Sequence, residues 1–396
     1  MTKILILDPS CEGDSHSHHL NAITGHATVM HKAGLQVVLG TNCNCNIENP
    51  CFDNNPVFKY TIYDDYRKKR TGYLPRLFRR LRYTALKKHI TASIQLLIRK
   101  KSIDAMDHVF VPTTDWLMYQ ALLKVFQIHS QLPYLHLLLM YEDGNWLTGG
   151  YPYLEIINSL KSQISENRKL FIYTETLCHA RHLGSALGIQ IETYPFPALP
   201  FTQISEKKDT DSVYIGVLGG GRKDKGYALL PEIIKIFNTM YAGNNVMFAI
   251  QEARVEDKLS QETVQLKKIH NVTLVGNELK RPEYERQLLK CDITLFPYNE
   301  IVYRCRGSGI VNEAVANGKP VLCSEETSLT EAIVSGNGAS ADSPEEFANM
   351  LIQMITNLDQ YRKNANTAKE MYLLQLYNNP VVRNIRNIIN QQQTGR

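Results

Sequence analysis

Long hydrophobic runs are missing from this sequence. No stretch of its 396 residues contains about 18 consecutive apolar residues, the length that a helix needs to cross a bilayer, so no membrane-spanning helix is expected. The apolar run near the start, residues 4–7, is too short for the core of a secretory signal peptide. Internal repeats and low-complexity segments are also absent, so the chain is not a repeat array. Its composition is that of a soluble globular protein.

Cysteine is sparse, with eight residues scattered along the chain. Without a secretory signal, such cysteines are expected to be reduced thiols, which favours a cytoplasmic protein. Cys43, Cys45 and Cys51 lie close together, and histidines gather at positions 16, 18 and 19. Neither group has the spacing and partner cluster of a metal site. Neither a metal nor a cofactor is predicted.

Acidic residues are absent from residues 67–101, which contain thirteen Lys and Arg. The whole chain has a net charge of +5, so the remainder carries about −8, the difference between +5 and +13. Apolar residues recur at helical spacing in this segment, and two interpretations stay open. The helix could lie on an anionic membrane surface, which would make the protein peripheral at the inner face of the membrane. It could equally pack on a sheet with a solvated basic face. Nucleic acid is not expected, because no recognised binding motif accompanies the charge.

The length indicates two domains, and strand-like runs alternate with helical patterns in both halves. We expect a first Rossmann-like domain over 1–195, a proline-rich linker over 196–211 and a second Rossmann-like domain over 212–378. A final helix in 379–396 is one that could cross back to the first domain. Expected strands cover residues 3–8, 36–39, 108–111, 134–139, 170–174, 213–218, 245–250, 272–277, 293–296 and 320–322.

The most informative stretch is residues 291–323. The run 293–296 is a strand, and Gly307-Ser308-Gly309 then opens a helix that ends before Gly318. Glycines allow close backbone approach to a ligand, and a helix N-terminus favours phosphate. Arg304 and Arg306 add full charges just before this helix. Glu313, on the same helix, suits the hydroxyls of a ribose or sugar; the alternative is an ordinary helix with a solvated carboxylate.

Residues 307–321, GSGIVNEAVANGKPV, resemble the donor-binding signature of glycosyltransferase family 4, which has the GT-B fold. The family usually carries an earlier Glu eight positions before the second, and this sequence has Cys305 there. A second segment, GGGRKDKG at 219–226, resembles the family's Gly-Arg…Lys-Gly element, in which Arg and Lys hold the donor diphosphate. Either Lys223 or Lys225 could fill the lysine role.

The resemblance implies a GT-B fold, with two Rossmann-like α/β domains facing across a cleft. It places the donor diphosphate on the basic residues and glycine loops, the ribose on Glu313 and the nucleobase near Asn277. The expected donor-binding residues are Gly220, Gly221, Arg222, Lys225, Asn277, Arg306, Gly307, Ser308, Gly309 and Glu313.

The acceptor is expected on the first domain, because ligands of open α/β sheets bind at the carboxyl ends of strands. Candidates there are Gly13, Asp14, Ser15 and Glu142. Catalytic candidates are His16, His136 and Glu313. For His136, which the family resemblance suggests, a core histidine is the alternative.

The resemblance therefore implies a retaining glycosyltransferase, usually without a required metal, that takes a UDP- or GDP-sugar. The acceptor would be a glycan or a lipid-linked molecule in polysaccharide or glycolipid biosynthesis. Two alternatives remain. One is another GT-B enzyme, either a nucleotide-sugar epimerase or an inverting transferase, which would need a general base such as His16, His18 or Asp14. The other is a non-catalytic nucleotide-sugar-binding or membrane scaffold protein.

Overall fold

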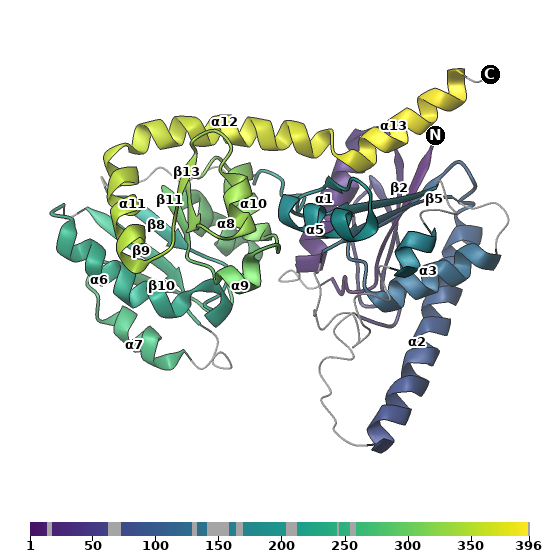
Figure 1. The fold of residues 1–396 in the computed structure, drawn as a ribbon, viewed down its shortest axis with the longest axis horizontal. Helices are drawn as coiled ribbons and strands as arrows, with labels where there is room; N and C mark the ends of the chain where they lie inside the picture. The colour runs from purple at the N-terminus through teal and green to yellow at the C-terminus, as the bar shows by residue number, and fades with distance from the viewer. Residues whose placement is uncertain are drawn as a thin grey trace. The chain divides into compact units, whose positions relative to one another are not determined.

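The computed structural model describes residues 1–13, 18–61, 73–128, 133–140, 158–163, 169–202, 212–243, 245–253 and 259–394. The chain forms two compact units (Figure 1). Unit 1 comprises residues Met1–Pro195 and Tyr377–Arg396, and unit 2 comprises Phe196–Leu376. Part of the expected linker, residues 203–211, lies outside the described residues.

Unit 1 is built on a seven-stranded parallel sheet with the order β3-β2-β1-β4-β5-β6-β7. The strands are β1 Lys3–Asp8, β2 Gln36–Asn42, β3 Phe52–Phe58, β4 His108–Val111, β5 Tyr134–Leu139, β6 Leu170–Thr174 and β7 Glu192–Thr193. The helices include α1 His18–Lys32, α2 Tyr73–Lys100, α3 Trp116–Ile128, α5 Leu177–Leu187 and α13 Pro380–Thr394. The strand order reverses direction at β1 and β4, as in doubly wound folds.

Helices cover both faces of this sheet. Side chains of α2, α3 and α5 pack against alternate residues of the strands, such as Leu5, Val109 and Leu137. On the opposite face, His26 of α1 contacts the ring of Phe110. A parallel sheet needs this double cover because its strands are apolar on both faces.

The final helix, α13, packs within unit 1. Its Asn384 donates a hydrogen bond to the Tyr173 hydroxyl at 2.9 Å, and its Arg383 pairs with Glu192.

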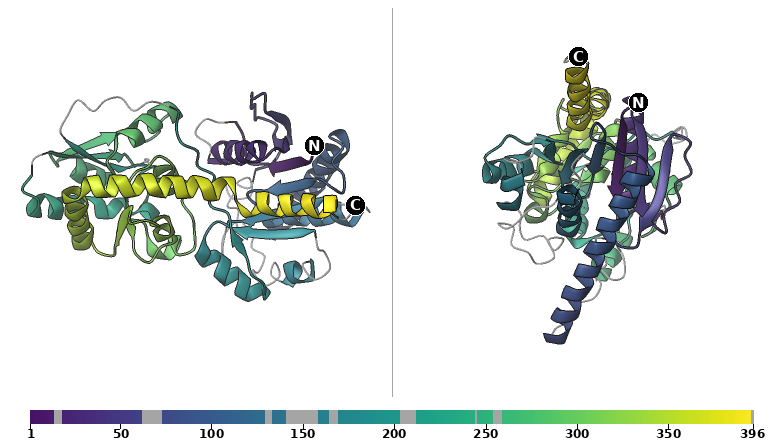
Figure 2. Two further views of the ribbon diagram at one scale, coloured as in Figure 1. Left: turned by 90° about the horizontal axis from the view of Figure 1, so that it is seen from above. Right: turned by 90° about the vertical axis from the view of Figure 1, so that its right-hand side faces the viewer.

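Helix α2 extends beyond the sheet of unit 1, and its N-terminal end lies farthest from the strands in two views (Figures 1 and 2). The C-terminal half is anchored by Ile90, Ile94 and Leu97, which are fully buried. Leu81, by contrast, is 60% exposed. Among the described residues, no helix combines the length and the apolar character that crossing a bilayer requires.

Unit 2 contains a six-stranded parallel sheet with the order β10-β9-β8-β11-β12-β13. Its strands are β8 Val213–Val217, β9 Val246–Gln251, β10 Val272–Val275, β11 Ile293–Phe296, β12 Val321–Ser324 and β13 Gly338–Ala341. Its helices include α6 Leu230–Met240, α7 Ser260–Lys267, α8 Arg281–Lys290, α9 Glu300–Tyr303, α10 Gly309–Ala316, α11 Pro344–Thr356 and α12 Leu358–Tyr377.

The core of unit 2 lies between the sheet and helices α6 and α11, with Phe237, Phe248 and Leu351 fully or almost fully buried. The strand order reverses between β8 and β11, so the loops after these two strands are where an open α/β sheet binds its ligand. The expectation of two Rossmann-like α/β domains is confirmed.

Candidate functional site

The loop after β8 begins with Gly219, Gly220 and Gly221 and is called the glycine loop below. Its backbone conformation requires glycine at the first two of these positions. Gly219 and Gly220 have φ angles of 103° and 80°, in the left-handed region that other residues avoid. A Cβ on Gly219 would lie 1.9 Å from Cδ1 of Ile310, so this loop touches the first turn of α10. No atom of the described residues lies within 4 Å of the corresponding position at Gly220. The side of Gly220 on which a Cβ would lie therefore faces open space.

The amides of this loop are held by the side chain of Gln251, the last residue of β9. Its Oε1 accepts hydrogen bonds from the backbone N–H of Gly219 and of Gly220, each at 2.7 Å. Its Nε2 donates to the carbonyl oxygen of Asn277 at 3.2 Å. These two loop N–H groups are therefore satisfied within the protein.

Lys225 follows on a 3₁₀ turn, Lys223–Lys225, that ends at Gly226 with φ 69°. Its ammonium donates to the carbonyl oxygen of Gly219 at 2.6 Å and lies 5.5 Å from the ring centre of Tyr298. Burial, together with the nearby charges of Arg222 and Arg306, lowers the pKa of Lys225 to about 7. Lys223 is exposed, so Lys225 is the lysine that belongs to the loop.

Arg222 is held in place by Asp224 and Tyr303. Its guanidinium donates to the Asp224 carboxylate at 2.9 Å and to the Tyr303 hydroxyl at 3.0 Å. Burial opposes the charge, but Tyr303 and Asp224 outweigh it and raise the pKa of Arg222. Its buried Nε has no hydrogen-bond partner among the described residues, so it is a donor that a ligand could satisfy.

These groups line one small cavity at the carboxyl ends of β8 and β9. Its walls are Val217, Leu218, Gly220, Gly221, Arg222, Lys225, Tyr227, Leu230, Gln251 and Tyr298. Four residues predicted from the sequence motif thus border the same space: Gly220, Gly221, Arg222 and Lys225.

The second predicted segment contributes the N-terminus of α10. Ser308 is the N-cap residue, and its side chain makes no capping hydrogen bond. Arg306 lies 5.4 Å from the ring centre of Tyr303, and its backbone carbonyl accepts a hydrogen bond from Ser328 at 2.6 Å. Gly307 and Gly309 flank the cap, and all these positions are partly exposed.

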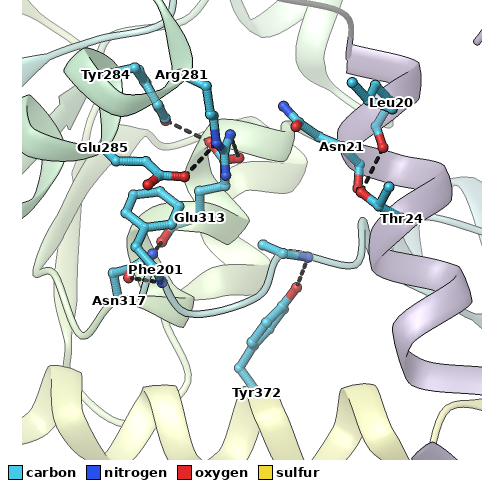
Figure 3. A network of polar contacts seen from close by, with 11 residues as sticks. Leu20, Asn21, Thr24, Phe201, Arg281, Tyr284, Glu285, Glu313, Asn317 and Tyr372 are labelled. Carbon is cyan, nitrogen blue, oxygen red and sulfur yellow. Dashed lines mark hydrogen bonds and ion pairs between the residues drawn. The ribbon is translucent and has the colours of Figure 1, made fainter. Parts of the chain in front are cut away.

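Glu313 lies one turn further along α10 and is 5% exposed (Figure 3). One carboxylate oxygen accepts from Arg281 at 2.6 Å, and the other accepts from the Tyr284 hydroxyl at 2.6 Å. Arg281 also bonds Glu285 at 2.7 Å and lies 4.9 Å from the ring centre of Phe201. Glu313 is therefore not a solvated surface carboxylate. Each of its oxygens keeps one further lone pair that could accept from a hydroxyl.

The structure corrects the expectation for His136. This residue lies inside β5, is 0% exposed, and both its ring nitrogens are engaged, by His108 at 3.0 Å and by the Tyr173 hydroxyl at 2.9 Å. Burial lowers the pKa of His136 well below the usual value. His136 is thus a core histidine and not a group that faces a substrate.

Most of the other catalytic and acceptor-side candidates of unit 1 lie where the structure gives no description. Asp14, Ser15, His16 and Glu142 lie outside the described residues. Gly13 is described, with φ 76°, and packs against the backbone of Cys45.

Sequence reasoning missed Gln251, Arg281 and Tyr284. No motif marks them, because each acts on a predicted residue far away in the chain. The only available signal was that Gln251 is a polar residue at the end of an apolar strand, where ligand-binding residues of α/β sheets gather.

Comparisons with solved structures identify the fold. The chain is similar to the sucrose-phosphate synthase of Thermosynechococcus elongatus, with 12% identity, a TM-score of 0.67 and coverage of 100% of both chains. It is also similar to the α,α-trehalose-phosphate synthase (UDP-forming) of Burkholderia vietnamiensis, with 11% identity and a TM-score of 0.69 over 98% of this chain and 99% of that one. Anabaena HepE in complex with UDP gives 12% identity and a TM-score of 0.63 over 100% of both chains. The chain therefore has the GT-B fold of glycosyltransferases.

The sequence itself matches a known family over part of its length. Residues 200–371 match the family model of glycosyl transferases group 1, whereas no curated protein sequence matches the chain. This segment contains both glycine loops, Lys225 and Glu313. The matched segment, 172 of the 396 residues, is therefore similar to glycosyl transferases group 1.

Proposed function

We propose that this enzyme moves a sugar from a nucleotide-diphosphate donor to a glycan or lipid-linked acceptor, with retention of anomeric configuration, in polysaccharide or glycolipid biosynthesis. The observation that carries the donor half is the cavity bordered by Arg222, Lys225 and Gly220. A departing nucleoside diphosphate gains negative charge, and fixed cations in a partly buried site stabilise it.

We assign the diphosphate to Arg222, Lys225 and Arg306, with the Ser308–Gly309 end of α10 as a further phosphate contact. Glu313 would accept from the ribose hydroxyls. Asn277 follows β10 and is exposed, so its loop is free to meet the base. Uracil is our first choice, since Anabaena HepE was solved with both UDP and UDP-glucose.

The donor assignment is tested by calorimetric titration of UDP, GDP and ADP against the wild type and Arg222→Met. We expect micromolar binding of one diphosphate, weakened at least about tenfold by the loss of one charge-assisted contact. Lys235→Met, an exposed lysine on α6, is the matched control and should bind as the wild type does. Absence of binding by all three diphosphates would refute the donor assignment.

Retention is tested on the product. Nuclear magnetic resonance of the newly formed linkage shows its anomeric configuration directly. A product with the configuration of the donor supports the proposal. An inverted product would favour the inverting alternative and a general base in unit 1.

The basic helix α2 supports an anionic, lipid-associated acceptor. Its N-terminal half, residues 73–86, carries four of the eight Lys and Arg of the helix and extends away from the sheet (Figure 1). Each Lys or Arg near an anionic bilayer contributes about 1 kcal/mol of attraction. Arg82→Glu with Lys88→Glu should therefore abolish sedimentation with phosphatidylglycerol vesicles at low salt. The matched control is Arg99→Glu with Lys100→Glu, at the other end of the same helix. Equal binding by both pairs would remove the argument for membrane contact.

A further inference from the structure

Gln251 occupies a position that connects three parts of the donor site. Strand β9 lies between β8 and β10, with Ile250 paired to Val217 and Gln251 paired to Val275. The side chain at its end therefore sits between the loop that follows β8 and the loop that follows β10. It bonds both, through the amides of the glycine loop and the carbonyl of Asn277.

The chemistry of the side chain suits this place. A glutamine amide offers one oxygen with two lone pairs and one NH₂ with two hydrogens. Both lone pairs of Oε1 are taken by the N–H groups of Gly219 and Gly220 at 2.7 Å. Gln251 is 8% exposed, so a side chain fixed at both ends in this way holds a single orientation.

The connection continues to the lysine. Gly219, whose N–H bonds Gln251, presents its carbonyl oxygen to the Lys225 ammonium at 2.6 Å. The same glycine thus links the amide of Gln251 to the charge of Lys225. If the loop shifts, the acceptor that holds this ammonium shifts with it.

The occupied amides have a second consequence. Because Gln251 satisfies the N–H groups of Gly219 and Gly220, they are not free to bind phosphate in this arrangement. Anion binding then depends on the side chains of Arg222 and Lys225, which line the same cavity as Gln251. The glycine loop then contributes no free N–H from Gly219 or Gly220 to the anion, and Gln251 holds the conformation of its backbone.

We infer that Gln251 is a positioning residue of the diphosphate site, which fixes the glycine loop and thereby the ammonium of Lys225. This inference rests on the proposed donor site. It concerns the phosphates rather than the base or the sugar. Inorganic pyrophosphate is therefore a sufficient probe, and it separates this effect from any change at the Asn277 loop.

Gln251→Met keeps the length of the side chain and removes all three hydrogen bonds. We expect it to weaken pyrophosphate and UDP by the same factor, at least about tenfold, since both ligands share the diphosphate contact. In a Lys225→Met background the same change should cost less than about threefold, because residues that act through one another are not additive. Gln261→Met, an exposed glutamine on α7, is the matched control. Circular dichroism and thermal melting establish that each variant is folded.

Gln251→Glu provides a second test that does not depend on losing the loop contacts. Its carboxylate still accepts from both amides but places a negative charge beside the cavity. That charge favours the protonated form of Lys225, whose pKa is lowered to about 7 by burial and by the nearby arginines. The pH above which pyrophosphate binding weakens should therefore move upward if the side chain at position 251 lies close to the Lys225 ammonium.

The outcomes distinguish a wrong donor site from a wrong role for Gln251. If the wild type binds neither UDP nor pyrophosphate, the proposed donor site is wrong and this inference falls with it. If the wild type binds both, and folded Gln251→Met and Gln251→Glu bind them with unchanged affinity and pH dependence, only the role of Gln251 is refuted. Weakening of UDP without weakening of pyrophosphate would also refute it, because Gln251 would then act on the base.

Discussion

Diphosphate binding should depend on pH through Lys225. In the free enzyme its pKa is lowered to about 7, first by burial and then by Arg222 and Arg306. The ammonium is therefore charged below pH 7 and loses its proton as the pH rises above it. The negative charge of a diphosphate beside the ammonium favours its protonated form and raises the pKa of Lys225 again. Binding at pH 8 should consequently take up a proton.

The size of the effect follows from linkage. If bound UDP returns the pKa of Lys225 to the ordinary lysine value of about 10.4, about 0.9 proton is taken up per UDP at pH 8, and the Kd rises about 50-fold between pH 7 and pH 9. The terminal phosphate of UDP has a pKa of about 6, so the ligand does not titrate in this window. Burial raises the pKa values of Tyr298 and Tyr303, which keeps both phenols neutral there. Arg222 stays charged throughout.

The assay is calorimetry of UDP binding in buffers of different ionisation enthalpy, at several pH values. The dependence of the measured heat on the buffer gives the number of protons taken up. In Lys225→Arg the guanidinium remains charged, so proton uptake should vanish and the Kd should stay level above pH 7. Lys223→Ala, on the same turn but exposed, should behave as the wild type does. A Kd that is level from pH 7 to pH 9 in the wild type would refute the reasoning, as would an unchanged slope in Lys225→Arg.

Two further predictions concern stability. Glu313→Gln should lower the free energy of unfolding by about 1.5–3 kcal/mol in urea titrations, because it removes one of the two carboxylates that pair with the half-buried guanidinium of Arg281 and leaves only Glu285; no change would mean that the Arg281–Glu313 ion pair is not formed. Gly226→Ala should be more costly than Gly188→Ala, measured by thermal unfolding. Both glycines have positive φ, but the new Cβ at Gly226 would lie 1.7 Å from the carbonyl oxygen of Pro297, whereas no atom of the described residues lies within 4 Å at Gly188. Equal losses of thermal stability in the two variants would show that the positive φ, and not the contact with Pro297, causes the loss.

Much of the fold was predictable because strands of parallel sheets are short apolar runs between turn residues. The runs 134–139, 170–174 and 293–296 coincide with β5, β6 and β11. Strand β3 was missed because its sequence, FDNNPVF, contains Asn-Asn-Pro, and it survives as the edge strand of the sheet. Helix α12 was missed because its 20 residues are largely polar and no glycine or proline marks its start.

The candidate site also contains residues that the sequence predicted and residues that it did not. The cations and glycines were found because they are adjacent in sequence and carry a motif. Gln251 was not found, because its hydrogen bonds join residues more than 25 positions apart. His136 shows the converse problem. A histidine in a buried strand has the same sequence context whether it packs in the core or faces a ligand, and only the contacts with His108 and Tyr173 decide.

The pairing of charges bears on Cys305, which stands where the resembling family usually has a glutamate. Among the described residues, Arg222 has Asp224 as its ion-pair partner, and Arg281 is shared by Glu285 and Glu313. Lys225 and Arg306 form no ion pair with a described carboxylate, and the buried Cys305 places no carboxylate beside Arg306 where the resemblance implies one. A carboxylate at position 305 would offset one of the two unpaired cations. With cysteine there, the proposed donor site keeps both cations for the charge that would develop on a departing diphosphate. Under the proposed donor assignment, the contact to the sugar that the resemblance gives to the missing Glu would come from another group.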